Sequence, residues 1–268
     1  MGIQEAYAEL VEGIYYLRQP LRPGLLAPSY DSIDPFLARP PNAEGVQRFH
    51  HGLLEQIRDA RYDIVETFAS GDKLAARYVI TGARSDGARF SVHGISMNEW
   101  TPEGFTRGWS LNDYRDLKVL TSAAPAVEVV DRWGSDAVRG APGSHLATYL
   151  ALIDAIYMQR DVSKIARFVD ERYLSIDPFI DRAVGRAGVA EFHSRVLAEF
   201  SDVDYRVVDS VEQDDRLAVR YVARGTRHDG STSTVLGLSI NHFESNKLRR
   251  GWVMNHYAGV DARIGVAR

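Results

Sequence analysis

The chain has 268 residues, of which 45% are hydrophobic and 25% are charged, so it is long enough for two globular domains of roughly 100–150 residues each. A formal net charge of −4 argues against a nucleic-acid surface, and the absence of cysteine excludes disulfides, thiolate metal sites and cysteine nucleophiles. The sequence has neither a signal-peptide pattern nor a run of about 18 apolar residues, so we expect a soluble, cytoplasmic protein without a membrane or nucleic-acid partner.

A seven-residue motif occurs twice, as YDSIDPF at 30–36 and as YLSIDPF at 173–179. The same offset of 143 residues holds without a gap from Tyr30/Tyr173 to Tyr114/Tyr257, with 34 identities among the 85 aligned pairs. Solenoid repeats are only about 20–50 residues long, so this period indicates two duplicated domains. We expect domain 1 at 1–116, a linker at 117–143 and domain 2 at 144–268. The apolar content around Trp133 predicts that part of this linker packs against a domain.

Each half begins with helical patterns and continues with extended ones. Apolar residues recur at helical spacing over 4–17 and 145–159, and second helices are predicted over 44–58 and 187–200. Four extended segments follow in the first half, at 62–70, 73–83, 88–100 and 104–114, with equivalents 143 residues later. Helices followed by an antiparallel meander predict an α+β fold.

The second helix of each half carries a histidine, His50 or His193, within its apolar stripe. A histidine that faces an apolar interior is either a hydrogen-bonded core residue or an acid, base or donor that lines a cavity.

The last strand of each half ends its tryptophan-bearing face with a titratable group. Trp109, Leu111 and Asp113 share one face, and Trp252, Met254 and His256 share its equivalent. A partly desolvated carboxylate at position 113 would have its pKa raised and could act as a general base. The alternative is that the strand end simply emerges into solvent.

The run from GVAEFHSRVLAEF through GWVMNHY, and its copy in the first half, resemble the SnoaL-like, polyketide-cyclase-like domains of the nuclear-transport-factor-2-like superfamily. The resemblance implies a cystatin-like cone in which a curved antiparallel sheet wraps around helices and encloses an apolar pocket. In cyclases of this group, an aspartate four residues after the last-strand tryptophan is the general acid/base, and neither a metal nor a cofactor takes part. By position this residue is Asp113, and the second half departs from the pattern with His256.

Acid/base chemistry beside a carbonyl group also needs donors and an apolar wall. The candidate set in the first half is His50, Asn98, Tyr15, Tyr16 and Trp109, and in the second half it is His193, Asn241, Tyr157 and Trp252. The aspartates of the repeated motif, Asp34 and Asp177, are turn-formers on one interpretation and line the pocket on the other.

The leading hypothesis is a tandem protein that binds a small apolar carbonyl compound and cyclises, isomerises or dehydrates it without a cofactor. The alternative is a non-catalytic ligand-binding or protein-interaction module. Apolar sheet faces predict that the halves pack as an internal pseudo-dimer, with further homodimerisation open. These faces contain His93, Ile95 and Met97 in the first half and Leu236, Leu238 and Ile240 in the second.

Overall fold

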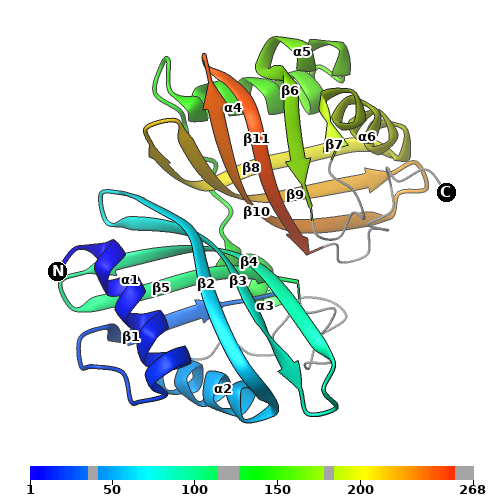
Figure 1. Ribbon diagram of the computed structural model, residues 1–268. Coiled ribbons are helices and arrows are strands. Elements are labelled where there is room, and N and C mark those ends of the chain that lie inside the picture. The colour runs from blue at the N-terminus through cyan, green and yellow to red at the C-terminus, as the bar shows by residue number, and fades with distance from the viewer. Residues whose placement is uncertain (36–41, 114–126, 178–183, 257–268) are drawn as a thin grey trace. The chain divides into compact units, whose positions relative to one another are not determined.

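The computed structural model describes residues 1–35, 42–113, 127–177 and 184–256 of the chain. It divides into two compact units, Met1–Val129 and Val130–Arg268, and each unit has its own helices and its own curved sheet (Figure 1). The α+β class predicted from the sequence is therefore confirmed, whereas the pseudo-dimer packing of the halves stays a prediction. Among the described residues, no helix is long and apolar enough to cross a membrane.

Domain 1 has a five-stranded sheet in the order β1-β5-β4-β3-β2. Its helices are α1 (Ile3–Val11), which continues as a π-helical segment (Glu12–Leu17), and α2 (Ala43–Gln56). Its strands are β1 (Leu26–Ile33), β2 (Ile57–Ser70), β3 (Lys73–Arg84), β4 (Arg89–Thr101) and β5 (Gly104–Asn112). The meander β2 to β5 matches the four predicted segments, but β1, which pairs parallel to β5, was not predicted. Pro28 interrupts the strand pattern there, and β1 tolerates it because an edge strand can lack a donor.

Domain 2 repeats this plan with a six-stranded sheet in the order β7-β6-β11-β10-β9-β8. Its helices are α4 (His145–Ile153), which continues as a π-helical segment (Asp154–Met158), a 3₁₀ turn (Val162–Lys164), α5 (Ile165–Phe168) and α6 (Arg186–Glu199). Its strands are β6 (Val169–Ile176), β7 (Val184–Gly185), β8 (Phe200–Gln213), β9 (Arg216–Arg227), β10 (Thr232–Glu244) and β11 (Lys247–His256). The Ser144 hydroxyl accepts from the Ala147 N–H at 3.0 Å, as expected for an N-cap.

The second part of the predicted linker contains α3 (Val127–Trp133), whose last residue packs against the sheet of domain 2. Trp133 is fully buried, and its indole N–H donates to the Tyr221 carbonyl oxygen at 3.0 Å. Gly134 follows with φ +114, and a Cβ there would lie 3.0 Å from an Arg220 nitrogen. The backbone therefore passes close over the ion pair between Arg220 and Asp209, whose nearest atoms are 3.1 Å apart.

A glycine in the middle of each sheet makes room for a tyrosine ring on the neighbouring strand. Gly237 of β10 pairs with Tyr221 of β9, and a Cβ on Gly237 would lie 2.0 Å from Tyr221 Cζ. Gly94 and Tyr78 repeat the arrangement in domain 1, at 2.4 Å. Each ring thus lies across the interior face of the sheet, where only glycine leaves it space.

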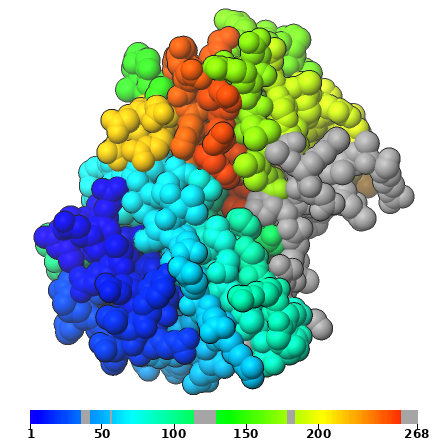
Figure 2. All heavy atoms as spheres, in the orientation of Figure 1, coloured from blue at the N-terminus to red at the C-terminus, as the bar shows by residue number. Residues whose placement is uncertain are grey.

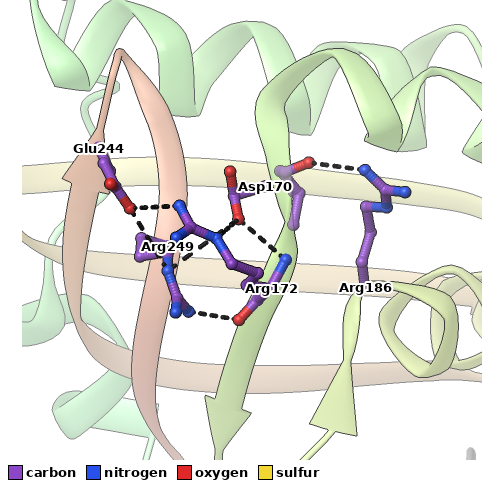
Figure 3. Close-up of polar contacts among 6 residues, drawn as sticks. Asp170, Arg172, Arg186, Glu244 and Arg249 are labelled. Carbon is purple, nitrogen blue, oxygen red and sulfur yellow. Dashed lines mark hydrogen bonds and ion pairs between the residues drawn. The ribbon is translucent and has the colours of Figure 1, made fainter.

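The strands β6 and β11 lie side by side at the surface of domain 2, yellow-green and orange in Figure 2. A network of charged side chains joins β6 to β11 and to the end of β10 (Figure 3). Arg172 Nη2 lies 2.7 Å from Glu244 Oε2, and Arg172 Nε lies 3.1 Å from Asp170 Oδ1. Arg249 Nε lies 3.4 Å from the same Glu244 oxygen. The counterparts in domain 1, at an offset of 143, are the uncharged residues Ala27, Ser29, Thr101 and Thr106.

We expect this network to contribute little stability. Both Arg172 and Glu244 are more than half exposed, so water screens their attraction. Arg172→Ala should lower the free energy of unfolding of domain 2 by no more than about 1 kcal/mol. A double-mutant cycle with Glu244→Ala, followed by urea denaturation, measures the coupling, and a value above about 2 kcal/mol would contradict this expectation.

Candidate functional site in domain 2

Three tyrosine rings stack along the interior of domain 2. Tyr157 stacks on Tyr205 at 5.4 Å between ring centroids, and Tyr205 stacks on Tyr221 at 4.7 Å. A fourth hydroxyl, on Tyr149, shares a 2.9 Å hydrogen bond with that of Tyr205. Tyr157 lies in the π-helical segment after α4, where the wider turn shifts the direction of the side chains. The interior therefore presents a row of phenol groups against the sheet.

His193 of α6 contacts one end of this row. Its Nδ1 lies 2.9 Å from the Tyr157 hydroxyl, and the two rings meet edge to face. Burial lowers the pKa of His193 to about 4, so the ring is neutral at pH 7. In the tautomer whose Nδ1 accepts from Tyr157, the proton is on Nε2, and that N–H can donate to a bound oxygen. His193 thus makes the hydrogen bond expected of a core residue and also occupies the position expected of a cavity-lining residue.

A buried carboxylate lies at the other end, at the close of the repeated motif. The Tyr221 hydroxyl donates to Asn255 Oδ1 at 2.6 Å, and Asn255 Nδ2 donates to Asp177 Oδ2 at 3.3 Å. Asp177 is only 8% exposed, so its carboxyl group depends on hydrogen bonds and not on bulk water. The pocket-lining interpretation of this motif therefore fits Asp177 better than that of a simple turn-former.

These groups surround a cavity of about 230 Å³. Its wall is mostly apolar, and His193 and Asp177 both line it. The apolar lining comes mainly from α4, α6 and the interior face of the sheet, and it includes Leu152, Ile156, Val189, Phe192, Val196, Phe200, Val203 and Leu248. The cavity is smaller than a pocket for a drug-sized molecule, so it suits a ligand of one or two rings.

Domain 1 repeats the polar pattern of this interior. The Tyr15 hydroxyl shares a 3.0 Å hydrogen bond with His50 Nδ1, and burial together with the neighbouring His51 lowers the pKa of His50 to about 4. Asn112 links the Tyr78 hydroxyl, at 2.8 Å, to Asp34 Oδ2, at 3.0 Å. Asp34 is 2% exposed. The duplication has therefore kept the hydrogen bonds of the site in both copies.

The last-strand residues named from the sequence lie on the outer face of each sheet, and not on the face that borders the interior. Ser110 and Asn112 reach Asp34 in the interior, so strand alternation places Trp109 and Asp113 on the outer face. The alternation was predicted correctly, but the sequence does not say which of the two faces is enclosed. The structure therefore does not bring Asp113 together with His50.

The corresponding residues of domain 2 follow the same geometry. Trp252 and His256 pair with Ile240 and Leu236 of β10, and neither lines the cavity. Burial lowers the pKa of His256 to about 4, but its side chain faces away from His193 and Asp177. Their predicted roles at the pocket are not supported by this placement.

Of the remaining predicted residues, three lie in the interior of their domain and one lies outside it. Asn241 and Tyr157 line the cavity, and Asn98 is buried in the interior of domain 1, where its Nδ2 donates to Ser96 Oγ at 3.1 Å. Tyr16 is 49% exposed, and its hydroxyl donates to the Tyr62 carbonyl oxygen at 2.9 Å, outside the interior.

Several interior residues were missed from the sequence although they are identical in the two halves. They are the pairs Tyr62/Tyr205, Tyr78/Tyr221, Ser96/Ser239 and Asn112/Asn255. Their identity at the 143-residue offset was the signal that could have identified them, and Ser96 and Ser239 also share a strand face with Asn98 and Asn241.

Comparison with known families agrees with this architecture. A family model described as a SnoaL-like domain matches residues 23–104 and again residues 149–251. The chain belongs to the SnoaL-like domain family. A search of curated proteins found no match.

Several solved structures are similar to parts of this chain. A SnoaL-like polyketide cyclase from Agrobacterium tumefaciens is 21% identical, with a TM-score of 0.37, over 42% of this chain and 91% of its own. TsrD from Streptomyces laurentii is 21% identical, with a TM-score of 0.37, over 44% of this chain and 96% of its own. A protein from Catenulispora acidiphila with a ketosteroid isomerase-like fold is 14% identical, with a TM-score of 0.34, over 40% and 83%.

The second SnoaL-like domain thus combines a mostly apolar cavity, a neutral histidine and a buried carboxyl group. Such groups can bind the oxygen of an otherwise apolar molecule and can transfer a proton. Within the described parts of the chain, no group of three or more His, Cys, Asp or Glu side chains is arranged to hold a metal ion.

Proposed function

We propose that domain 2 binds a small, mostly apolar carbonyl compound and moves a proton on it by acid/base catalysis. The observation that carries this proposal is that the cavity is lined by both His193 and Asp177. A carboxylate and a neutral imidazole in one apolar cavity are an acceptor and a donor for the same ligand.

The roles follow from the hydrogen bonds of each group. The neutral His193 ring donates from Nε2 to the ligand's carbonyl oxygen, because its Nδ1 is engaged with Tyr157. Asp177 accepts the proton from the carbon next to the carbonyl group, and the resulting enolate oxygen is stabilised by the donor. The amide of Asn255 holds the carboxylate in place. The mostly apolar walls lower the local dielectric constant, which strengthens both interactions.

The test uses 2-tetralone, a bicyclic ketone whose carbon–hydrogen bonds beside the carbonyl group exchange with deuterium. We expect the protein to bind it and to accelerate exchange in D₂O, measured by NMR. Asp177→Asn should keep binding but lower the acceleration by at least about 100-fold, since a general base contributes about 10²–10⁴. The matched control is Asp202→Asn on β8, an exposed aspartate whose loss should leave exchange unchanged.

The outcomes separate catalysis from binding. Binding without accelerated exchange would overturn the catalytic part and favour the non-catalytic ligand-binding module. If the protein binds neither 2-tetralone nor its hydrocarbon analogue tetralin, the proposal is overturned.

A further inference from the structure

The two domains differ in the side chains that fill the end of the interior near one hairpin, which joins β3 to β4 in domain 1 and β9 to β10 in domain 2. In domain 2 the cavity reaches Ala223 and Gly225 of β9 and Ser233 of β10. The Ser233 hydroxyl accepts from Arg227 at 2.7 Å, so its polarity is already satisfied. Small side chains at 223 and 233 therefore leave this end of the interior open.

Domain 1 carries large apolar residues at the same places. Ile80 corresponds to Ala223 and Phe90 corresponds to Ser233, and each is 5% exposed within the core cluster of domain 1. Phe90 pairs with Gly82 across the strands, as Ser233 pairs with Gly225. A Cβ on Gly82 would lie 3.0 Å from Phe90 Cζ. The phenylalanine ring thus occupies the space over the glycine that borders the cavity in domain 2.

A third position offsets part of this difference in side-chain volume. Ile57 of domain 1 corresponds to Phe200 of domain 2, and both pack over the paired glycine. Domain 2 therefore has small side chains in place of Ile80 and Phe90, and larger ones beside them at Phe200 and at Val203, where domain 1 has Ala60. The difference at this end of the interior lies mainly in side-chain volume, because both domains keep the tyrosine–histidine and tyrosine–asparagine–aspartate hydrogen bonds.

We propose that domain 2 alone binds the ligand, that Ile80 and Phe90 close the corresponding site in domain 1, and that residues 223 and 233 set the size of ligand that is accepted. This inference rests on the proposed function for the nature of the ligand. It gives the duplicated chain one working pocket and one copy whose interior is filled by its own side chains.

Isothermal titration of the full chain with 2-tetralone tests the inference first. We expect one site for each chain. Two equivalent sites would overturn the inference while leaving the proposed function intact. If one site is found, the domain that holds it is identified by giving domain 2 the corresponding residues of domain 1.

The decisive variant gives domain 2 the residues of domain 1, as Phe200→Ile, Ala223→Ile and Ser233→Phe together. Exchanging all three together limits overpacking, because Phe200→Ile offsets part of the volume that the changes at 223 and 233 add. We expect 2-tetralone affinity to fall at least tenfold while the circular dichroism spectrum stays unchanged. The matched variant Ile80→Val keeps domain 1 filled and should retain wild-type affinity. Unchanged affinity in the triple variant would overturn the inference.

Xenon binding, observed by NMR, separates the two proposals, because xenon enters apolar cavities whatever their chemistry. We expect xenon to bind the wild type and to lose its site in the triple variant. If this loss is seen but 2-tetralone does not bind the wild type, the proposed function fails and the assignment of the open cavity to domain 2 stands. Equal xenon binding by the wild type and the triple variant would overturn that assignment.

Discussion

Replacing Gly237 by alanine is expected to lower the melting temperature of domain 2 by roughly 10 °C. A methyl group at this position would lie 2.0 Å from Tyr221 Cζ, far inside the contact distance, so the ring has to move. Moving it also disturbs the hydrogen bond to Asn255 at 2.6 Å. Overpacking of this kind costs about 3 kcal/mol, and each kcal/mol shifts the melting temperature of a domain of this size by about 3–4 °C.

Differential scanning calorimetry measures this effect, with Gly52→Ala as the control. Gly52 lies in α2 with no atom within 4 Å of an added Cβ, so alanine there should raise the stability of domain 1 by up to about 1 kcal/mol through its helix propensity. A Gly237→Ala protein that melts at the wild-type temperature would show that Tyr221 does not need the space that glycine leaves.

The second large effect expected is a loss of stability in mild acid. Burial lowers the pKa of both His50 and His193 to about 4, whereas an unfolded histidine has a pKa near 6.5. Between these values the unfolded chain binds more protons than the folded one. The stabilisation is therefore complete above about pH 6.5 and is lost as the pH falls toward 4. We expect about 1–2 kcal/mol for each histidine, less than complete burial would give because both side chains keep partial solvent access.

Urea denaturation at pH values between 7 and 4 tests this dependence. Carboxylates also titrate in this range, so the informative quantity is the difference between the wild type and the double variant His50→Gln/His193→Gln. Glutamine can accept the same tyrosine hydrogen bond but does not titrate. The double variant should show a shallower pH dependence; parallel curves for the two proteins would contradict the neutral, buried state of these histidines.

The sequence was sufficient to predict the duplicated α+β fold, because hydrophobic periodicity and the 143-residue repeat are local signals. It predicted four strands of each meander but missed β1, since Pro28 and the irregular pairing with β5 break the alternation of a strand. Strand boundaries differed from the predicted ones by a few residues, as in β2, which begins at Ile57 directly after α2.

The candidate site was predicted in part, for a physical reason. His193, Tyr157 and Asp177 were named because an apolar helix face and a motif identical in both halves marked them. Asp113 and His256 were named from a strand pattern with period two, which groups residues on a face without telling which face the helices cover. Only the packing of Asn112 and Asn255 inside the domains decides that question.

The most direct test of the central claim is a crystal structure of the chain soaked with 6-bromo-2-tetralone, whose bromine gives an anomalous signal. The account predicts one bromine site, inside the cavity of domain 2, with the ketone oxygen within hydrogen-bond distance of His193. A bromine site in the interior of domain 1, or on the outer sheet face beside Asp113 or His256, would contradict it.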